Sequence, residues 1–346
     1  MQITKLLFIS VVFCSYTVSA DVIKIYNWEE YLSEEMLSKF TEATGHTVEQ
    51  FYYDDEDYRD SLLASGLGED FDLVMVDNLS LKSDLQNSGF VSFPVEKIPS
   101  TKNISSQWIQ SCGPKGIAYG WGTLGIAYRS SISSEPIDSW VQLFKPPKEH
   151  QGRVVMLKDS SDTINSALMA SGRSPNSINP DDYKMAYQIL NDQKEHVLLY
   201  GYGLSYAKDH GQESQMTMTI VYSGDTEQIM EETGFTDWEY VVPKEGTMLW
   251  VDCWTVPIKM NAYKPAVISF LNFINQPKNA AINADEVWVS LPINSAIKFT
   301  SADYQADPEL HPNKDILMRS HTYEPLPNAI LNLRDRILSE IIQKAP

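Results

Sequence analysis

The chain has 346 residues, of which 43% are apolar and 11% aromatic, and its formal net charge is −19 at pH 7. This length favours two domains over one, and the apolar fraction can build substantial cores. The acidic balance argues against a nucleic-acid partner, because phosphate binding needs clustered lysine and arginine, and it is compatible with a cationic small molecule.

Residues 1–20 have the pattern of a secretory signal peptide. Lys5 supplies the positive start, residues 6–13 form a short apolar segment, and Val18-Ser19-Ala20 resembles a cleavage site. The apolar segment is too short to span a bilayer, and no later stretch is long and apolar enough to do so. We therefore expect an exported, soluble protein that is not itself membrane-spanning and whose mature chain begins at Asp21.

Strand and helix patterns alternate over the first part of the mature chain. We expect strands at 22–26, 48–52 and 71–76, with helices at 33–45, 57–64 and 79–87 after them in turn. This β-α-β-α-β order predicts a parallel sheet with right-handed crossovers. Ligands of such sheets lie beyond the carboxyl ends of the strands, which here are residues 27–31 and 77–78. Aromatic and acidic side chains gather at these ends, which favours a binding site.

The segment Gly120-Trp-Gly122-Thr-Leu-Gly125 fits the G-x-G-x-x-G pattern of dinucleotide-binding proteins. That fingerprint requires a helix directly after the glycines, whereas residues 126–128 predict an extended segment. We therefore expect no nucleotide site and no cofactor.

The rest of the chain mixes strands and helices in the same α/β manner, without an internal repeat. We expect helices at 136–144, 163–170, 182–191, 227–232, 265–274, 280–284 and 328–342, and strands at 154–157, 218–222, 240–242 and 248–254. Asp162 is placed to be the N-cap of the helix that starts at Thr163. The acidic run 54–57 lacks the glycine and the spacing of a calcium loop, and it predicts a solvated surface.

The strand from Met248 to Trp254 sends Trp250, Asp252 and Trp254 to one face, because side chains alternate along a strand. A buried carboxylate needs a partner, and indole faces attract cations by about 0.5–2 kcal/mol per contact. The pattern fits the binding of an organic cation. It fits equally well a core strand whose Asp252 meets a lysine or arginine of the protein itself.

Cys112 and Cys253 are the cysteines of the expected mature chain. An exported protein permits a disulfide between them, and two buried free thiols are the alternative. Because Cys253 alternates with Asp252 along its strand, we expect it to face the core.

The sequence favours a binding protein over an enzyme. Its six histidines are scattered, and it carries neither an H-E-x-x-H nor a G-x-S-x-G motif. Asp159 and Asp162 can be imagined as the acid–base pair of a secreted hydrolase, but helix capping and amine binding both fit them better. We therefore expect no catalysis and no metal site.

Stretches spread over most of the mature chain carry a resemblance to a known family. They are Tyr26-Asn-Trp-Glu-Glu-Tyr31, Phe71-Asp-Leu-Val74, Tyr119-Gly-Trp-Gly122, Tyr222-Ser-Gly224 and Val242-Pro-Lys-Glu-Gly-Thr-Met-Leu-Trp-Val-Asp252. In these stretches and their order the chain resembles the periplasmic spermidine/putrescine-binding proteins of bacterial import systems.

The resemblance implies a two-lobe periplasmic binding protein of the Venus-flytrap type, an α/β fold with mixed, mainly parallel sheets and a two-strand hinge. It implies an N-terminal lobe of residues 21–127 and 254–296 and a C-terminal lobe of residues 128–253 and 297–346. It further implies a monomer in the periplasm that closes over a small polyamine.

The resemblance also implies which side chains contact the ligand. They are the aromatic residues Trp28, Tyr31, Tyr222, Trp250 and Trp288 around the methylene chain, and the acidic residues Glu29, Asp77, Asp159, Asp162 and Asp252 against the ammonium groups. Asp252 would face an inner ammonium, and Asp159 with Asp162 a terminal one. Asp77, where relatives have a small polar residue, would face the other terminus together with Glu29. Separated acidic positions predict a triamine, norspermidine or spermidine, because a diamine would leave one buried charge unpaired.

The chain is similar, in addition, to a branch of this family that senses norspermidine and spermidine and signals through an inner-membrane cyclic-di-GMP enzyme. We expect such a receptor as its partner. The permease of an ABC importer, to which a transport protein delivers its polyamine, is the alternative partner.

Overall fold

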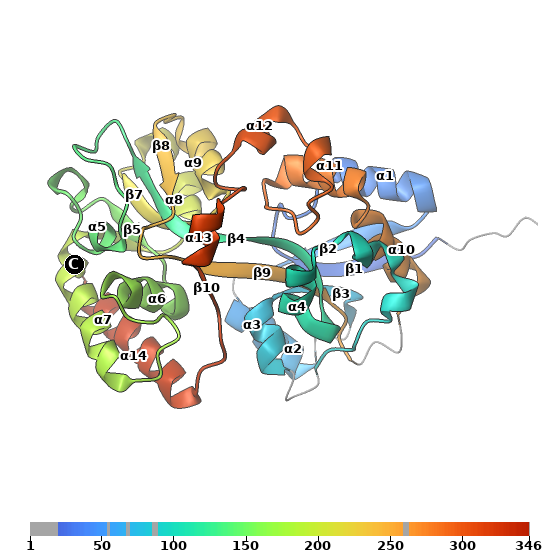
Figure 1. The fold of residues 1–346 in the computed structure, drawn as a ribbon, viewed down its shortest axis with the longest axis horizontal. Helices are drawn as coiled ribbons and strands as arrows, with labels where there is room; N and C mark the ends of the chain where they lie inside the picture. Colours follow the sequence, from blue (N-terminus) through green and yellow to red (C-terminus); the bar gives the residue numbers. More distant parts are fainter. Residues whose placement is uncertain (1–19, 54–55, 67–69, 85–88, 259–262, 346) are drawn as a thin grey trace, which may run out of the picture.

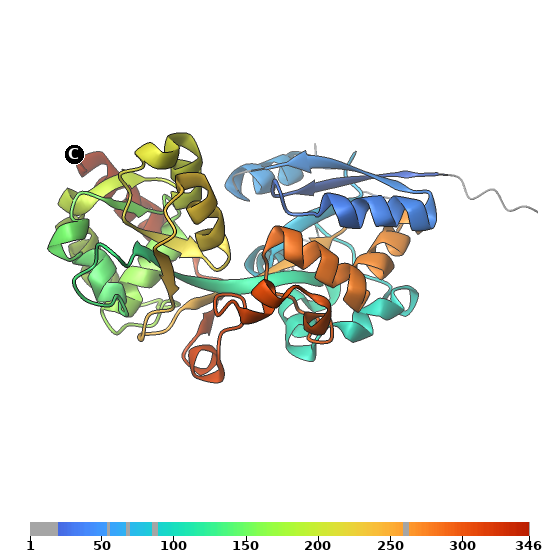
Figure 2. The same ribbon diagram turned by 90° about the horizontal axis from the view of Figure 1, so that it is seen from above.

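The computed structural model describes residues 20–53, 56–66, 70–84, 89–258 and 263–345. The expected signal peptide, apart from Ala20, and the first two residues of the acidic run lie outside this described part of the chain. The chain forms two parts that are connected by the long strands β4 (Ile117–Arg129) and β9 (Met248–Thr255) (Figures 1 and 2).

The first part is built on the predicted β-α-β-α-β unit. Strand β1 (Val22–Asn27) lies between β2 (Thr47–Tyr52) and β3 (Leu73–Asp77), and it is parallel to both. The helices between and after them are α1 (Glu34–Thr44), α2 (Glu56–Ser65) and α3 (Asn78–Asp84). Ser33 caps α1 by accepting a hydrogen bond from the Met36 amide at 3.1 Å, and Gly45 ends the helix in a left-handed conformation with φ 75°.

The sheet becomes antiparallel where the two parts meet. Strand β9 pairs antiparallel with β3 on one side and with β4 on the other, and its first residues pair parallel with β10 (His321–Thr322). Strand β4 continues into the second part, where it pairs antiparallel with β7 (Met218–Tyr222) and β8 (Trp238–Val241). Beyond β7 follow β5 (Val154–Met156) and β6 (Val197–Tyr200) in parallel pairs. The sheet is therefore mixed, and β4 with β9 are the two strands of the hinge.

Strand β4 also accounts for the glycine motif. It stays extended through Gly120, Gly122 and Gly125, so no helix follows the glycines and the expectation of no dinucleotide fingerprint is confirmed. A Cβ added at Gly122 would lie 2.4 Å from the ring of Trp250, which pairs with it on β9. This glycine therefore allows the indole to lie directly on the strand.

Helices cover the sheet in both parts (Figure 1). The remaining ones are α4 (Ser106–Cys112), α5 (Trp140–Phe144), α6 (Ser160–Ala170), α7 (Pro180–Gln193), α8 (Gly203–His210), α9 (Asp225–Thr233), α10 (Pro265–Ile274), α11 (Pro277–Val287), α12 (Ala302–Ala306), α13 (Lys314–Met318) and α14 (Asn328–Lys344). The predicted amphipathic tail is α14, which packs on α6 and α7. In the described part of the chain, no helix combines the length and the apolarity that crossing a bilayer requires.

The start of α6 differs from the prediction. The helix begins at Ser160, and its N-cap is Asp159, whose carboxylate accepts the Asp162 amide at 2.6 Å. Asp162 is therefore inside the first turn and is not the cap. Aspartate is a favoured N-cap residue, and either Asp159 or Asp162 could accept an amide from the first turn of a helix that starts after it. The sequence could not choose between the two aspartates.

Each part has its own core. Ile25, Phe40 and Phe270 belong to the core of the first part, and Trp140 and Ile337 to that of the second. A smaller cluster covers the opposite face of the second sheet. The division of the chain into lobes at defined residues stays a prediction.

Along each of the two connecting strands, the side chains at one end pack in the first core and those at the other end pack in the second. Along β4 the change falls between Trp121 and Leu124, a few residues before the expected crossing at 127/128. Along β9 it falls between Met248 and Val251, before the expected crossing at 253/254. Leu310, which was expected in the C-terminal lobe, packs in the first core.

A disulfide joins Cys112 at the end of α4 to Cys253 on β9, with Cα atoms 5.9 Å apart. Of the two alternatives that the sequence allowed, the structure has the bridge. It closes a sequence separation of 141 residues, and closing a loop longer than a hundred residues stabilises the fold by about 4–5 kcal/mol in the chain-entropy account. Cys253 is completely buried, as its alternation with Asp252 predicts.

Candidate functional site

The carboxylate of Asp252 lies where β3 and β9 meet. Asp77 at the end of β3 pairs directly with Asp252 in the sheet register. The hydroxyl of Tyr31 donates a hydrogen bond to Oδ2 of Asp252 at 2.6 Å. Burial and the charge of nearby Asp77 raise the pKa of Asp252, whereas the Tyr31 hydrogen bond and the charge of Arg59 lower it; together they bring it to about 6. This carboxylate is therefore held by a neutral hydroxyl, and its negative charge is expensive to bury without a countercharge.

The face of β9 that carries Asp252 runs from the site into the core. Trp250 is partly buried, whereas Trp254 is 1% exposed and packs edge-on against Tyr119 and Phe270. The predicted alternation is therefore present. Trp254 is a core residue, and of the two indoles only Trp250 lies at the edge of that core.

The second part contributes a similar group around Asp162. Asp162 is 4% exposed, and its carboxylate accepts hydrogen bonds from the hydroxyls of Tyr222, at 2.7 Å, and Tyr323. Burial raises the pKa of Asp162, and both tyrosine hydrogen bonds lower it. Asp159 is exposed and caps α6. Tyr323 follows β10, far from the other residues in sequence, and no local pattern predicts its role.

Aromatic rings connect the two groups. The ring of Tyr222 packs edge-to-face on Trp250 with centroids 6.3 Å apart. The indole Nε1 of Trp250 is buried without a hydrogen-bond partner. On the first part, Trp28 is partly buried and lies with its ring 4.4 Å from that of Tyr53. The Tyr222–Trp250 contact thus joins the ring that bonds to Asp162 with the strand that carries Asp252.

Glu56, at the start of α2, is a further acidic residue of this site. Enclosure by the surrounding groups and the charges of Asp77, Asp252 and Asp159 raise its pKa well above the ordinary value, although 48% of its side chain remains accessible. Carboxylates from both parts of the molecule are therefore close enough to repel one another. The sequence placed Glu56 in a solvated acidic run, and its half-exposed side chain agrees with that prediction, although Glu56 also lies beside the carboxylates of the site.

The carboxylate of Asp77 is already bound within the protein. It accepts the Ser80 amide at 2.8 Å, which caps α3, and it accepts a hydrogen bond from Nη2 of Arg59 at 3.2 Å. The side chain of Arg59 is completely buried, and its guanidinium also lies 5.2 Å above the ring of Tyr53. Nothing in the helix pattern around Arg59 distinguishes it from a surface residue, so its burial could not be predicted from the sequence.

The contacts of Glu29 and Trp288 are with residues other than these carboxylates. Glu29 is exposed and close enough to Tyr52 to raise the pKa of that phenol. Trp288 has φ 57° at the end of α11, and its indole donates to Asp307 at 2.6 Å and packs on Tyr304. A direct role of either residue in ligand contact stays a prediction.

Ion pairs hold the two parts together beside the site. Lys208 on α8 pairs with Glu30 after β1 at 3.0 Å. Lys82 on α3 pairs with Glu324 at 3.1 Å and donates to the carbonyl of Tyr323 at 2.9 Å. Both pairs join residues of the first part to residues of the second.

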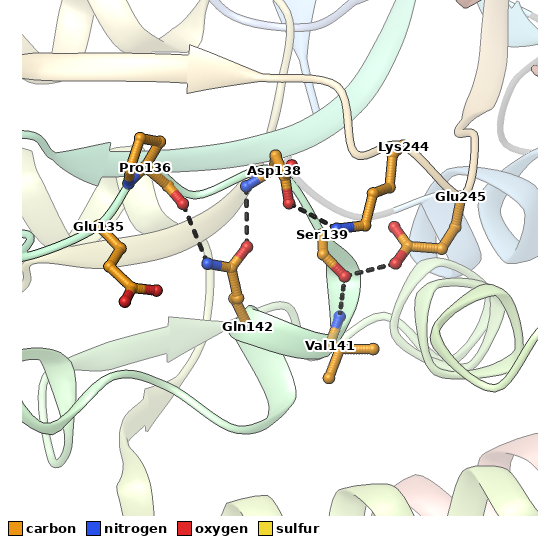
Figure 3. A pocket seen from close by; sticks show the side chains of 8 residues that line it. All are labelled: Glu135, Pro136, Asp138, Ser139, Val141, Gln142, Lys244 and Glu245. Atoms are coloured by element: carbon orange, nitrogen blue, oxygen red, sulfur yellow. Dashed lines mark hydrogen bonds and ion pairs between the residues drawn. The ribbon is translucent and has the colours of Figure 1, made fainter.

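A separate hollow of about 630 Å³ lies on the surface of the second part beside α5 (Figure 3). Its polar groups bond to one another: Lys244 pairs with Asp138 at 2.9 Å, and Ser139 donates to Glu245. Gln142 spans the same hollow through the Asp138 amide. These groups leave little polar capacity for a ligand. Among the described residues, no cluster of histidine, cysteine and acidic side chains is arranged to hold a metal ion.

The bacterial extracellular solute-binding protein family matches this sequence over residues 35–312. The chain belongs to this family. It is similar to the norspermidine sensor of Vibrio cholerae, at 30% identity over 94% of this chain and 90% of that protein. It is also similar to the putrescine-binding periplasmic protein SpuD of Pseudomonas aeruginosa, at 26% identity over 88% of both chains.

Solved structures agree on the fold. The spermidine/putrescine ABC transporter substrate-binding protein PotD from Streptococcus pneumoniae superposes with a TM-score of 0.81 at 22% identity, covering 94% of this chain and 99% of that one. A putative spermidine/putrescine ABC transporter protein from Listeria monocytogenes gives 0.82 at 23% identity, covering 92% and 98%. The expected two-lobe binding-protein fold and the resemblance to this family are thereby confirmed.

Proposed function

We propose that this protein binds a linear triamine, norspermidine or spermidine, between its two lobes in the periplasm. The observation that carries the proposal is the pair of buried carboxylates, Asp252 and Asp162, each held by tyrosine hydroxyls. The two belong to opposite parts of the molecule, and the contact between Tyr222 and Trp250 connects them. The ligand is released unchanged, since the family and fold are those of solute-binding proteins.

The chemistry of the two groups favours an ammonium ligand. A tyrosine hydroxyl satisfies one oxygen of a buried carboxylate but leaves its negative charge without a counterion. Burial and the adjacent carboxylate raise the pKa values of Tyr31 and Tyr222 well above the ordinary range, so both stay protonated and donate. Ammonium groups supply the missing positive charge, and the rings of Trp250 and Tyr222 pack against methylenes.

The names of the relatives support this ligand class. The relative at 30% identity is called a norspermidine sensor, and others are called putrescine-binding or spermidine/putrescine-binding periplasmic proteins. In our proposal Asp252 takes an inner ammonium, and Asp162 with Asp159 takes a terminal one. At the opposite terminus Arg59 lies 3.2 Å from Asp77 and 3.6 Å from Glu56, so these two carboxylates share one protein cation.

The output of binding is a signal to an inner-membrane receptor of the cyclic-di-GMP class. Similarity to the norspermidine sensor over 94% of this chain supports it. Delivery to an ABC permease is the second candidate, supported by the names of the transport-related relatives. Crosslinking of the ligand-bound protein in its native membrane, followed by identification of the captured partner, separates the two.

Titration calorimetry on the mature chain from Asp21 tests the ligand. We expect both triamines to bind at least about tenfold more tightly than putrescine, a difference of about 1.4 kcal/mol. Equal affinity for putrescine would overturn the triamine assignment, and no heat with any polyamine would overturn the function itself.

A further inference from the structure

Arg59 is a charged residue completely removed from solvent at the first-lobe end of the site. Its Nη2 lies 3.2 Å from Oδ2 of Asp77, and its Nη1 lies 3.6 Å from Oε1 of Glu56. The same side chain bonds to Ser80 at 3.0 Å and lies over the ring of Tyr53. These contacts fix the guanidinium between the two acidic residues.

A guanidinium keeps its charge at every pH a protein meets. Held between Glu56 and Asp77, it takes the place that a ligand ammonium would take at Asp77. A further ammonium reaching Asp77 meets a fixed like charge at short range instead of a free carboxylate. Asp252 pairs with Asp77 in the sheet register, and its charge raises the pKa of Glu56.

We infer that Arg59 is a specificity-determining residue that acts as a built-in cation. Its positive charge occupies the carboxylates of Asp77 and Glu56 beside Asp252. The site therefore selects polyamines that place no ammonium at Asp77. Ligands with an additional charged amine, such as the tetraamine spermine, are disfavoured. This inference rests on the proposed function, because it concerns how many ammonium groups the same polyamine site accepts.

The test is the affinity ratio of norspermidine to spermine, measured by calorimetry on the full mature chain. Arg59→Gln frees Asp77 and should shift this ratio toward spermine by at least roughly tenfold. The double variant Arg59→Gln/Asp77→Asn removes both charges and should restore the ratio of the parent. Arg129→Gln is the matched control, because Arg129 also pairs with an aspartate and lies over an aromatic ring, but outside the site.

Asp77→Asn keeps the test decisive where Arg59→Gln fails to fold. Asparagine still caps α3, so the fold is retained, while Arg59 loses one of its acidic partners and keeps Glu56 and Asp60, so the site becomes one charge more positive. We expect affinity to fall most for spermine, less for norspermidine and least for putrescine.

The two ideas fail separately. If the parent binds triamines and both variants change all polyamines by the same factor, Arg59 is only a structural tie between α2 and β3, and the inference is wrong. If the parent binds no polyamine, the proposed function itself is wrong.

Discussion

The two ends of the site hold their aspartates in different ways. Asp162 on α6 is bound by the hydroxyls of Tyr222 and Tyr323. Asp77 on β3 is bound by the guanidinium of Arg59 and the amide of Ser80. Both carboxylates are fully engaged in hydrogen bonds. A hydroxyl leaves the negative charge in place, whereas a guanidinium cancels it.

The difference shows that an acidic residue in a cleft is not by itself a binding group for a cation. What decides is the charge of its protein partners. Burial raises the pKa of Asp162 although two tyrosine hydroxyls and the charge of Arg334 lower it, which marks a charge that a bound cation would stabilise. Charge variants at the two ends should therefore differ in effect.

The largest expected effect comes from removing the carboxylates that tyrosines hold. Asp252→Asn and Asp162→Asn keep the side-chain shape but remove the charge, and losing one member of a buried charge pair typically costs about 2–5 kcal/mol of binding free energy. We expect triamine affinity to fall by at least about thirtyfold in each, measured by calorimetry. Asp77→Asn should cost the triamine less than either.

Asp237→Asn provides the control for that series. Asp237 pairs with Arg129 outside the site, as Asp77 pairs with Arg59 within it. We expect it to leave polyamine affinity unchanged. Asp252→Asn binding within a factor of a few of the parent would mean that Asp252 is a core residue, and the site would have to be placed elsewhere.

The next effect concerns the aromatic residues between the two ends. Trp250→Ala and Trp28→Ala each remove a ring face worth about 0.5–2 kcal/mol to a cation, so we expect affinity to fall by about three- to thirtyfold. Trp108 is unsuitable as a control because it is buried and stacks on Trp121. Phe299→Ala is better, since Phe299 is 43% exposed. Equal losses at all three positions would indicate general destabilisation.

The sequence predicted the elements of the first part well. The sequence patterns located β1, α1, β2, α2 and β3, of which α1 buries one apolar face and β3 is a continuous apolar run buried on both faces. The alternation along β9 also placed Asp252 and Cys253 on opposite faces. Local pattern was sufficient wherever a single element decided the outcome.

The partners of the acidic residues could not be predicted in the same way. Arg59 reaches Asp77 across 18 positions, and Tyr323 reaches Asp162 across 161. Such pairs depend on how the sheet and helices pack, which no local pattern encodes. The exchange of Asp159 for Asp162 as the N-cap has a different cause, since both positions offer the same chemistry to the same helix.

A third prediction concerns pH, which should affect triamine affinity and the stability of the free protein in opposite directions. Asp252 has its pKa raised to about 6, so it becomes protonated below that pH and loses the charge an ammonium needs. We expect triamine affinity to weaken by up to about tenfold for each pH unit below about 6, with proton release on binding. Calorimetry in buffers of different ionisation enthalpy measures that release. Asp252→Asn should abolish most of this dependence, and an unchanged profile would contradict it.

The free protein should respond in the opposite direction. Burial also raises the pKa of Asp162, and those of Asp225 and Glu309 to about 7 and about 8. The folded state therefore binds these protons more tightly than the unfolded state, so their contribution to stability is present at low pH and is lost as pH rises through the raised values. We expect the Tm of the free protein to fall between about pH 5.5 and pH 8. A Tm that rises over this interval would show that other groups dominate.

The smallest expected effect compares the ion pairs that hold the two parts together. Exposed ion pairs contribute about 0–1 kcal/mol, so Lys208→Ala and Lys82→Ala should each weaken binding by no more than about fivefold. The effects of the two substitutions should differ in size. Lys208 binds the exposed carboxylate of Glu30, whereas Lys82 binds Glu324 and also donates to the carbonyl of Tyr323, whose hydroxyl holds Asp162. Losing Lys82 therefore loosens the end of the site where charge is available, and we expect the larger increase in the triamine dissociation rate there, measured by stopped-flow Trp fluorescence. Equal rates in the two variants would mean that both pairs serve closure alone and that Tyr323 is held in place without Lys82.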